Sequence, residues 1–176
     1  MPHLYTIGHS THPLQEFIEI LHFYHINHLV DVRTVPKSRH VPWFNKEDLS
    51  ASLAKENIAY THLSKLGGLR KGSPTSINTG WRNASFRSYA DYMQTISFYE
   101  GLKELHDLIK NNTVVIMCAE ALPWRCHRSL IADAAIIRKI KVLDIISKSS
   151  IQPHKLTEFA IINKQTRPFQ IYYPKS

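Results

Sequence analysis

The chain has 176 residues, of which 43% are hydrophobic, and this length and composition predict a single globular domain over residues 1–176. A formal net charge of +8 favours an anionic partner, either a small molecule or a nucleic acid, although no run of consecutive Lys or Arg resembles a nucleic-acid-binding tail. Two cysteines exclude a disulfide-rich secreted scaffold, the first residues lack the pattern of a signal peptide, and no apolar run could cross a bilayer; we therefore expect a cytoplasmic protein with no membrane partner.

Apolar residues alternate along the chain between strand-like and helix-like spacing. Strands are predicted at residues 4–7, 29–32, 58–61, 113–117 and 142–146, with a final edge strand at 169–173. Helices are predicted at residues 13–21, 45–53, 88–109, 130–140 and 152–159. This alternation predicts an α/β fold, namely a three-layer sandwich with a mainly parallel central sheet of about five strands and helices on both faces.

A long polar segment, residues 69–87, separates the third strand from the longest helix. A loop of this length is usually functional or disordered. Ser88 and Asp91 have the spacing of a capping box, which predicts that the helix begins there, and Gly101 weakens its middle. Large aromatic side chains in the loops can either stack on nucleic-acid bases or pack over the core edge, and these are Trp43, Phe44, Trp81 and Trp124.

The richest motif runs from Met117 to Ser129, between the fourth strand and the next helix. It contains both cysteines of the chain, a carboxylate, an imidazole and two guanidinium groups, contributed by Cys118, Glu120, Arg125, Cys126, His127 and Arg128. A turn between a strand and a helix is where α/β proteins usually carry their chemistry.

Other polar residues follow the first three strands: His9 and Ser10, then Asp31, Arg33 and Ser38, then Gly67 and Gly68. The carboxyl ends of parallel strands lie along one edge of the sheet, where ligands bind in a crevice. We therefore expect these residues and the 117–129 motif to form one electropositive site at that edge.

Several short motifs occur together in a specific order: 6–10 (TIGHS), 30–33 (VDVR) with Pro36 and Ser38, 66–68 (LGG), Phe86 with 89–90 (YA), 118–120 (CAE), 126–128 (CHR) and 152–156 (QPHKL). In this combination the chain resembles the domain-of-unknown-function 488 family nearly from end to end. Members often have a histidine in the fifth strand, where this chain has Asp144. The resemblance implies the α/β fold and the position of the site; it implies no particular reaction, because the activity of the family is not established.

Cys126 is the better predicted nucleophile, because positive neighbours and a helix N-terminus both favour a thiolate. The alternative is a small residue in a tight turn. Cys118 ends an apolar strand and is expected to be buried, as a partner of that nucleophile or, if accessible, as the nucleophile itself. Glu120 is interpreted as a general acid or base, or as a salt-bridge partner of an arginine. His9 and His127 can transfer protons near neutral pH.

The remaining candidates are predicted to bind substrate. Arg33, Arg125 and Arg128 can hold a phosphate or carboxylate, or can instead form structural ion pairs. Asp31 can orient an arginine or the His9 ring. Gly67 and Gly68 suggest a turn with positive φ or a close backbone approach to a ligand. Ser10 and Ser38 complete the predicted binding set.

The leading functional hypothesis is therefore a small hydrolase or group transferase with a cysteine nucleophile and an anionic, nucleotide-like or nucleic-acid substrate. No G-x-G-x-x-G or Walker loop occurs, so no cofactor is predicted. One alternative is a non-catalytic nucleic-acid or nucleotide-binding protein, such as an accessory protein of DNA repair. A further alternative is a metal-binding protein that uses Cys118, Cys126 and His127 as ligands.

Overall fold

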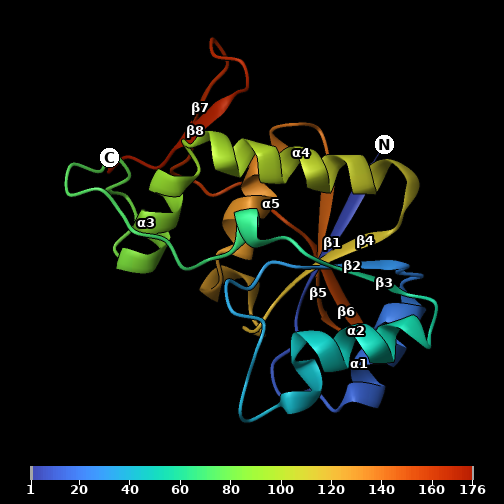
Figure 1. The fold of residues 1–176 in the computed structure, drawn as a ribbon. Helices are drawn as coiled ribbons and strands as arrows, with labels where there is room; N and C mark the ends of the chain where they lie inside the picture. Colours follow the sequence, from blue (N-terminus) through green and yellow to red (C-terminus); the bar gives the residue numbers. More distant parts are fainter. Residues whose placement is uncertain (1, 176) are drawn as a thin grey trace.

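A computed structural model describes residues 2–175 and shows one central sheet between two layers of helices (Figure 1). The sheet has six strands in the order β3-β2-β4-β1-β5-β6. Its strands are β1 (His3–Gly8), β2 (His28–Asp31), β3 (Ala59–His62), β4 (Val114–Cys118), β5 (Lys141–Ser147) and β6 (Ser150–Pro153). The first five are parallel, and β6 pairs with β5 in the antiparallel direction. The predicted mainly parallel sheet is confirmed, with one strand more than expected.

Helices cover both faces of the sheet, which confirms the three-layer α/β sandwich. One face carries α1 (Leu14–Phe23) and α2 (Lys46–Ala54), and the other carries α3 (Ala84–Tyr92), α4 (Ile96–Asn111) and α5 (Arg128–Ile136). Short 3-10 turns occur at η1 (Pro42–Phe44), η2 (Ser64–Leu66) and η3 (Pro123–Arg125). Within residues 2–175, the structure contains no helix that is both long and apolar enough to cross a membrane.

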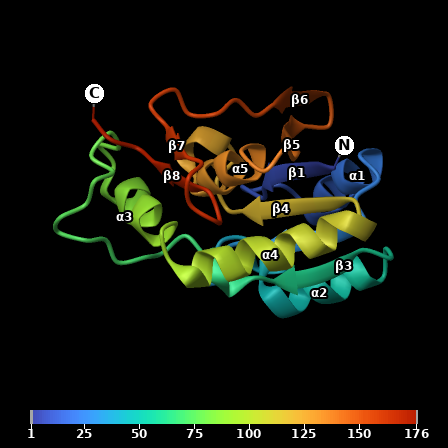
Figure 2. The same cartoon turned by 90° about the horizontal axis from the view of Figure 1, so that it is seen from above.

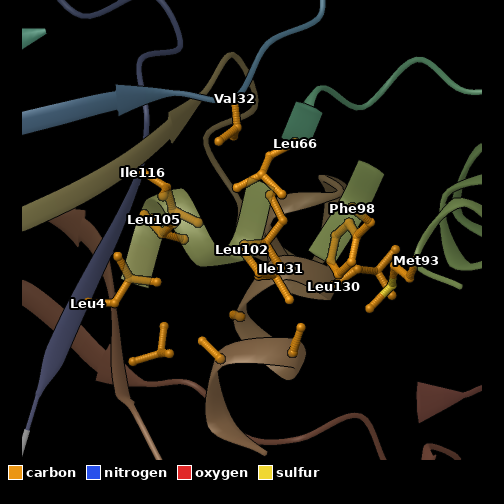
Figure 3. Packing of buried hydrophobic residues seen from close by; sticks show 14 of the residues in the cluster. Leu4, Val32, Leu66, Met93, Phe98, Leu102, Leu105, Ile116, Leu130 and Ile131 are labelled. Carbon is orange, nitrogen blue, oxygen red and sulfur yellow. The ribbon is translucent and has the colours of Figure 1, made fainter. Parts of the chain in front are cut away.

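The period-two alternation of β4 divides its side chains between the two helical layers. Val115 and Met117 pack with α1 and α2, whereas Val114, Ile116 and Cys118 pack with α4 and α5. Figure 3 shows part of the second cluster, where side chains from α4 and α5 meet those from the sheet. Burying one such Leu or Ile side chain contributes roughly 1.5–3 kcal/mol. This packing fixes the end of β4, and therefore the sulfur of Cys118, between the sheet and α5.

The long helix predicted at residues 88–109 is wrong in its boundaries, because two helices occupy this region. The first begins at Ala84, since the Asn83 side chain accepts hydrogen bonds from the first-turn amides of Ser85 and Phe86. The second begins after Thr95, whose hydroxyl accepts from the amide of Phe98. The predicted capping box fails because Ser88 lies inside α3.

The predicted helix at residues 152–159 is also wrong. Residues 150–153 form the edge strand β6 and the next residues are irregular, because they are bonded to neighbouring elements instead of to one another. The final predicted strand is present as β8 (Gln170–Tyr172), but it pairs with β7 (Ile161–Asn163) in a separate two-stranded sheet.

The polar loop before α3 is tied to one carboxylate of that helix. Asp91 accepts hydrogen bonds from the Ser73 amide, the Ser76 hydroxyl and the Asn78 side-chain amide. Asn78 is completely buried and in turn accepts from the Tyr173 amide. Asp91 therefore anchors this loop, which holds the C-terminal segment against α3, and it does not act as a helix cap.

Candidate functional site

A pocket of about 370 Å³ lies at the carboxyl edge of the parallel strands. The loops after β2, β3 and β4 converge on it, and the start of α3 closes one side. Figure 2 shows the carboxyl ends of β1, β3 and β4 directed toward α3. The pocket is lined by Arg33, Thr34, Val35, Gly68, Leu69, Ser85, Phe86, Cys118, Ala119, Glu120, Arg125, Cys126 and His127. The convergence of these distant segments agrees with the expectation from the sequence.

Cys118 lies against a buried arginine. Nη1 of Arg128 is 3.8 Å from Sγ of Cys118, and Nη2 donates to the carbonyl oxygen of Ala121 at 3.1 Å. Arg128 is fully buried, its Nε has no hydrogen-bond partner, and no carboxylate among residues 2–175 forms an ion pair with it. A buried cation without a counter-ion is costly. A thiolate on Cys118 would supply that counter-ion.

His127 is fixed in one tautomer by a backbone carbonyl. Its Nε2 donates to the carbonyl oxygen of Val32 at 2.8 Å, because that oxygen can only accept. Nδ1 is therefore the acceptor, and it lies 3.4 Å from Sγ of Cys126. Burial lowers the pKa of His127 to about 4, so its imidazole is neutral at physiological pH. In the structure, Nδ1 of His127 is therefore placed to accept a hydrogen bond from the Cys126 thiol.

The two thiols are shifted in opposite directions. Burial raises the pKa of Cys118, but its interaction with the Cys126 thiol and the charge of Arg128 outweigh burial and lower that pKa below its ordinary value. Burial and the neighbouring Cys118 sulfur both raise the pKa of Cys126 well above its ordinary value. Cys126 also lies before the His127 cap of α5, not within the first turn of that helix. This geometry reverses the predicted ranking and favours Cys118 as the thiolate.

Arg33 is largely committed to structural contacts. Its Nε and Nη2 donate to the two carboxylate oxygens of Asp31 at 2.9 and 2.7 Å, and Nη2 also donates to the Phe44 carbonyl. Its Nη1 lies 3.3 Å from Nε2 of His9. Asp31 is fully buried and also accepts from Tyr60. Of the two alternatives for Arg33, the structure shows the ion pair, and the guanidinium forms part of the pocket wall.

His9 lies behind this wall and does not line the pocket. Its Nδ1 donates to the Ser10 carbonyl at 2.8 Å, and its ring stacks on Phe44 with centroids 4.5 Å apart. Burial lowers the pKa of His9 to about 4, and the nearby Arg33 contributes to this shift. The neutral ring can therefore accept from Arg33 through Nε2. His9 positions Arg33 and is not placed to transfer protons to a ligand.

Besides the buried Asp31 and Arg128, three other predicted binding residues lie outside the pocket lining. Ser10 has a positive φ of 45° and its amide donates to the Ala119 carbonyl, which ties the first loop to the fourth. Ser38 contributes to a neighbouring cavity that also includes Val35 and Arg39. Gly67 packs against Thr34. These residues therefore shape or border the pocket without lining it.

Gly68 lines the pocket because it allows a close approach, not because its backbone is unusual. No glycine in residues 2–175 has a positive φ, so the alternative of a left-handed turn is wrong. A Cβ on Gly68 would lie 2.4 Å from Nδ1 of His127. Only glycine leaves room for the His127 ring at this point.

Glu120 and Arg125 are the predicted residues with charged groups open to solvent in the pocket. Neither forms an ion pair with another residue in the range 2–175, so the predicted salt bridge of Glu120 to an arginine is not observed. Glu120 follows Cys118 by two residues and lies at the same pocket. An exposed carboxylate and an exposed guanidinium, neither in an ion pair within residues 2–175, therefore line the same pocket as Cys118.

The apolar part of the pocket was not predicted from the sequence. Val35, Leu69 and Phe86 line it, with the hydroxyl side chain of Ser85 at the same helix start, and none of them was a candidate site residue. Recognising Asn83 as a helix cap would have placed Ser85 and Phe86 in a first helical turn. No such local signal exists for Val35 and Leu69, whose positions depend on the paths of two loops.

The metal-binding alternative lacks a ligand set. In the part of the chain that the structure describes, no three His, Cys, Asp or Glu side chains are grouped so that they could hold an ion. The ring nitrogens of His127 face a carbonyl oxygen and the Cys126 thiol, and the Cys118 sulfur faces a cation. Cys118, Cys126 and His127 therefore do not form the expected metal site.

A known protein family covers most of the chain. The family model described as Domain of unknown function DUF488 matches residues 13–135. No curated protein and no solved structure matches the chain. The matched region runs from before α1 to the last turn of α5 and includes every residue that lines the pocket. The chain therefore belongs to the DUF488 family, a family of unknown function.

Proposed function

We propose that this protein is a small hydrolase or group transferase that uses Cys118 as its nucleophile. The observation that supports this proposal is the contact between Cys118 and Arg128. A fully buried guanidinium, with no carboxylate partner among residues 2–175, lies 3.8 Å from the sulfur. A thiolate is the reactive form of cysteine, and a neighbouring cation favours it. The same sulfur lines the pocket, so a bound substrate can reach it.

The proposed reaction has two steps. The Cys118 thiolate attacks an electrophilic centre of the substrate and forms a bond from sulfur to that centre, while the bond to the leaving group breaks. The leaving group takes a proton from a water molecule in the open mouth of the pocket. In the second step a water molecule, or an acceptor hydroxyl in a transferase, attacks the centre and gives its proton to the Glu120 carboxylate. The bond to sulfur breaks, and Cys118 returns as the thiolate.

The pocket suits a substrate with an anionic group and an apolar or aromatic part. Arg125 is exposed, lines the pocket and has no ion-pair partner among residues 2–175, so its guanidinium is free to bind phosphate or carboxylate. Val35, Leu69 and Phe86 supply the apolar wall. A nucleotide-like group has both of these properties.

Alkylation of the thiols by iodoacetamide as a function of pH tests the proposal. Mass spectrometry of the alkylated peptides from the unaltered protein reports the titration of each thiol separately, with its neighbouring sulfur in place. We expect Cys118 to react with a midpoint below that of an ordinary thiol, about 8.5, and Cys126 to react only above it. An ordinary or higher midpoint for Cys118 would contradict the nucleophile role.

The non-catalytic binding protein remains the second candidate, because the unpaired Arg125 can bind an anion whether or not a reaction follows. The two candidates differ in the effect of single substitutions. For an enzyme, Cys118→Ser abolishes turnover and leaves binding nearly intact. For a binding protein, Cys118→Ser has no functional effect, whereas Arg125→Met weakens binding. Measuring both properties for both variants distinguishes the two candidates.

A further inference from the structure

Two basic cavities flank the pocket that contains Cys118. One lies next to it along the loop after β2, includes Lys37 and Arg39, and shares Val35 with the pocket. The other is formed by the residues before and within the start of α3 together with the C-terminal segment, and it includes Arg82 and Lys175. Ser85 and Phe86 of the same helix start belong to the central pocket. Basic side chains therefore adjoin the pocket both along the loop after β2 and around the start of α3.

The four flanking cations are exposed and available. Lys37, Arg39, Arg82 and Lys175 have no ion-pair partner in the described part of the chain. Most exposed carboxylates lie on α1, α2 and α4, and none lines either flanking cavity. Glu120 is the one carboxylate that lines the central pocket. The two flanking cavities therefore carry positive charge without a lining carboxylate, and this charge could attract an extended polyanion.

The rim of the pocket also carries exposed apolar side chains. Val35 and Leu69 line it and are 63% and 76% exposed, and Trp124, adjacent to Arg125, is 57% exposed. Large exposed rings beside unpaired cations are the combination that binds nucleic-acid strands, since the cations contact phosphates and the rings stack on bases. Of the four aromatic residues named in the sequence analysis, Phe44 is buried, Trp43 donates its indole N–H to the His12 carbonyl and Trp81 packs on Phe86, which leaves Trp124 for this role.

The depth of Cys118 determines the form of nucleic acid. The residue is only 2% exposed and is reached through the pocket, whose volume of about 370 Å³ lies in the range of small-ligand sites. A base-paired duplex cannot bring one of its nucleotides to such a sulfur without opening. A single strand can place one nucleotide in the pocket while its neighbours extend to both sides.

We propose that the substrate is a single-stranded nucleic acid, which places one nucleotide against Cys118 and its flanking phosphates on Lys37 and Arg39 on one side and on Arg82 and Lys175 on the other. This inference rests on the proposed function for the identity of the reacting residue. The proposed binding of the strand depends on the flanking cavities instead. An experiment can therefore reject the reaction at Cys118 without rejecting the strand-binding site, and the reverse.

Fluorescence anisotropy with labelled oligonucleotides tests the inference. The probes are DNA and RNA single strands of about ten nucleotides, within the site sizes of single-strand-binding proteins, a duplex of the same DNA sequence, and single nucleotides as competitors. We expect the single strand to bind more tightly than the duplex and than the nucleotides. Two double variants test the two flanks: Lys37→Glu with Arg39→Glu, and Arg82→Glu with Lys175→Glu. Each should weaken single-strand binding about tenfold. Each should also reduce the slope of log binding constant against log salt concentration by roughly 0.7 for each phosphate that is no longer neutralised.

Lys55→Glu with Lys103→Glu is the matched control, because it reverses the same charge on exposed residues of the helical layers. We expect this control to change single-strand affinity far less than either flanking variant. Equal losses of affinity in all three variants, tighter binding of the duplex, or single nucleotides that bind as well as the strand would overturn the inference. None of these outcomes affects the alkylation test of Cys118. Conversely, Cys118 could show the alkylation midpoint of an ordinary thiol while the flanking variants still lose single-strand affinity. That combination would reject the proposed reaction and retain the binding site.

Discussion

His127 and Val32 are joined by a hydrogen bond of 2.8 Å from a ring nitrogen to a carbonyl oxygen. These residues are 95 positions apart in the sequence, one at the cap of α5 and the other directly after β2. The bond links the loop after β2 to the loop before α5 and fixes the tautomer of the imidazole. As a result, the Cys126 thiol faces an acceptor nitrogen, and Cys118 is the thiol left beside the cation.

Arg128→Met should make Cys118 a less reactive thiol. The substitution removes the guanidinium that lies 3.8 Å from the sulfur and leaves an apolar side chain in a buried position. The Cys118 pKa should then rise, and its alkylation at neutral pH should slow by about tenfold for each pKa unit. Arg125→Met is the control, since Arg125 lines the same pocket without a hydrogen bond to the sulfur. Equal alkylation rates in the two variants would exclude Arg128 as the cause.

The protein should lose stability in mild acid. Burial lowers the pKa values of His9 and His127 to about 4, from 6.5 in a solvated histidine. Between these values the unfolded chain binds protons that the folded chain does not, so the free energy of unfolding falls as pH decreases from 6.5 to 4. Each histidine contributes at most about 3 kcal/mol to this decrease. Urea unfolding across this range should show a shallower pH dependence for His9→Gln and for His127→Gln, while the surface variant His40→Gln retains the original slope.

A second histidine network should weaken the protein in mild alkali. Burial alone would lower the pKa of His154, but hydrogen bonds to Asp133 and Asp144 raise it to about 9. The stabilisation from this charged ring is complete below pH 6.5 and is lost as pH rises through 9.

His154→Gln should therefore remove most of the decrease in stability between pH 6.5 and 9, which is roughly 2–3 kcal/mol. Thermal unfolding at several pH values measures it. A decrease of equal size in the variant would place its origin elsewhere.

Gly8→Ala should be far more damaging than Gly72→Ala. A Cβ at position 8 would lie 1.6 Å from the backbone carbonyl oxygen of Glu120, so the main chain of the pocket loop would have to move. At position 72 the nearest atom, at 2.5 Å, is the Ser88 hydroxyl, which can rotate away. We expect a loss of about 3 kcal/mol or more for Gly8→Ala and about 1 kcal/mol or less for Gly72→Ala, measured by denaturant unfolding. Similar losses would show that the Glu120 loop adapts easily.

Local patterns were sufficient to predict the layers of the fold. The runs at residues 4–7 and 113–117 are apolar and short, so they predict buried strands, and the first helix is amphipathic. Boundaries were less predictable where a side chain outside the segment decides them. Ser88 and Asp91 have the spacing of a cap, yet Asn83 captures the first amides, and Asp91 bonds to the loop before the helix. The segment after β6 has helical spacing, but it forms no helix. The amide and the hydroxyl of Thr157 donate hydrogen bonds to the Asp133 carboxylate instead.

By itself, the sequence predicted a mainly parallel α/β sandwich, because apolar periodicity and the alternation of strands with helices are local patterns. It also placed the polar residues in the loops after the strands. Only the tertiary structure decided what each of those residues does. Arg33 is bound to Asp31, Arg128 faces Cys118 and forms no ion pair with a carboxylate of residues 2–175, and His127 donates to Val32. The physical reason is that the charge state of a buried group depends on its few nearest neighbours, and here most of those neighbours come from distant parts of the chain.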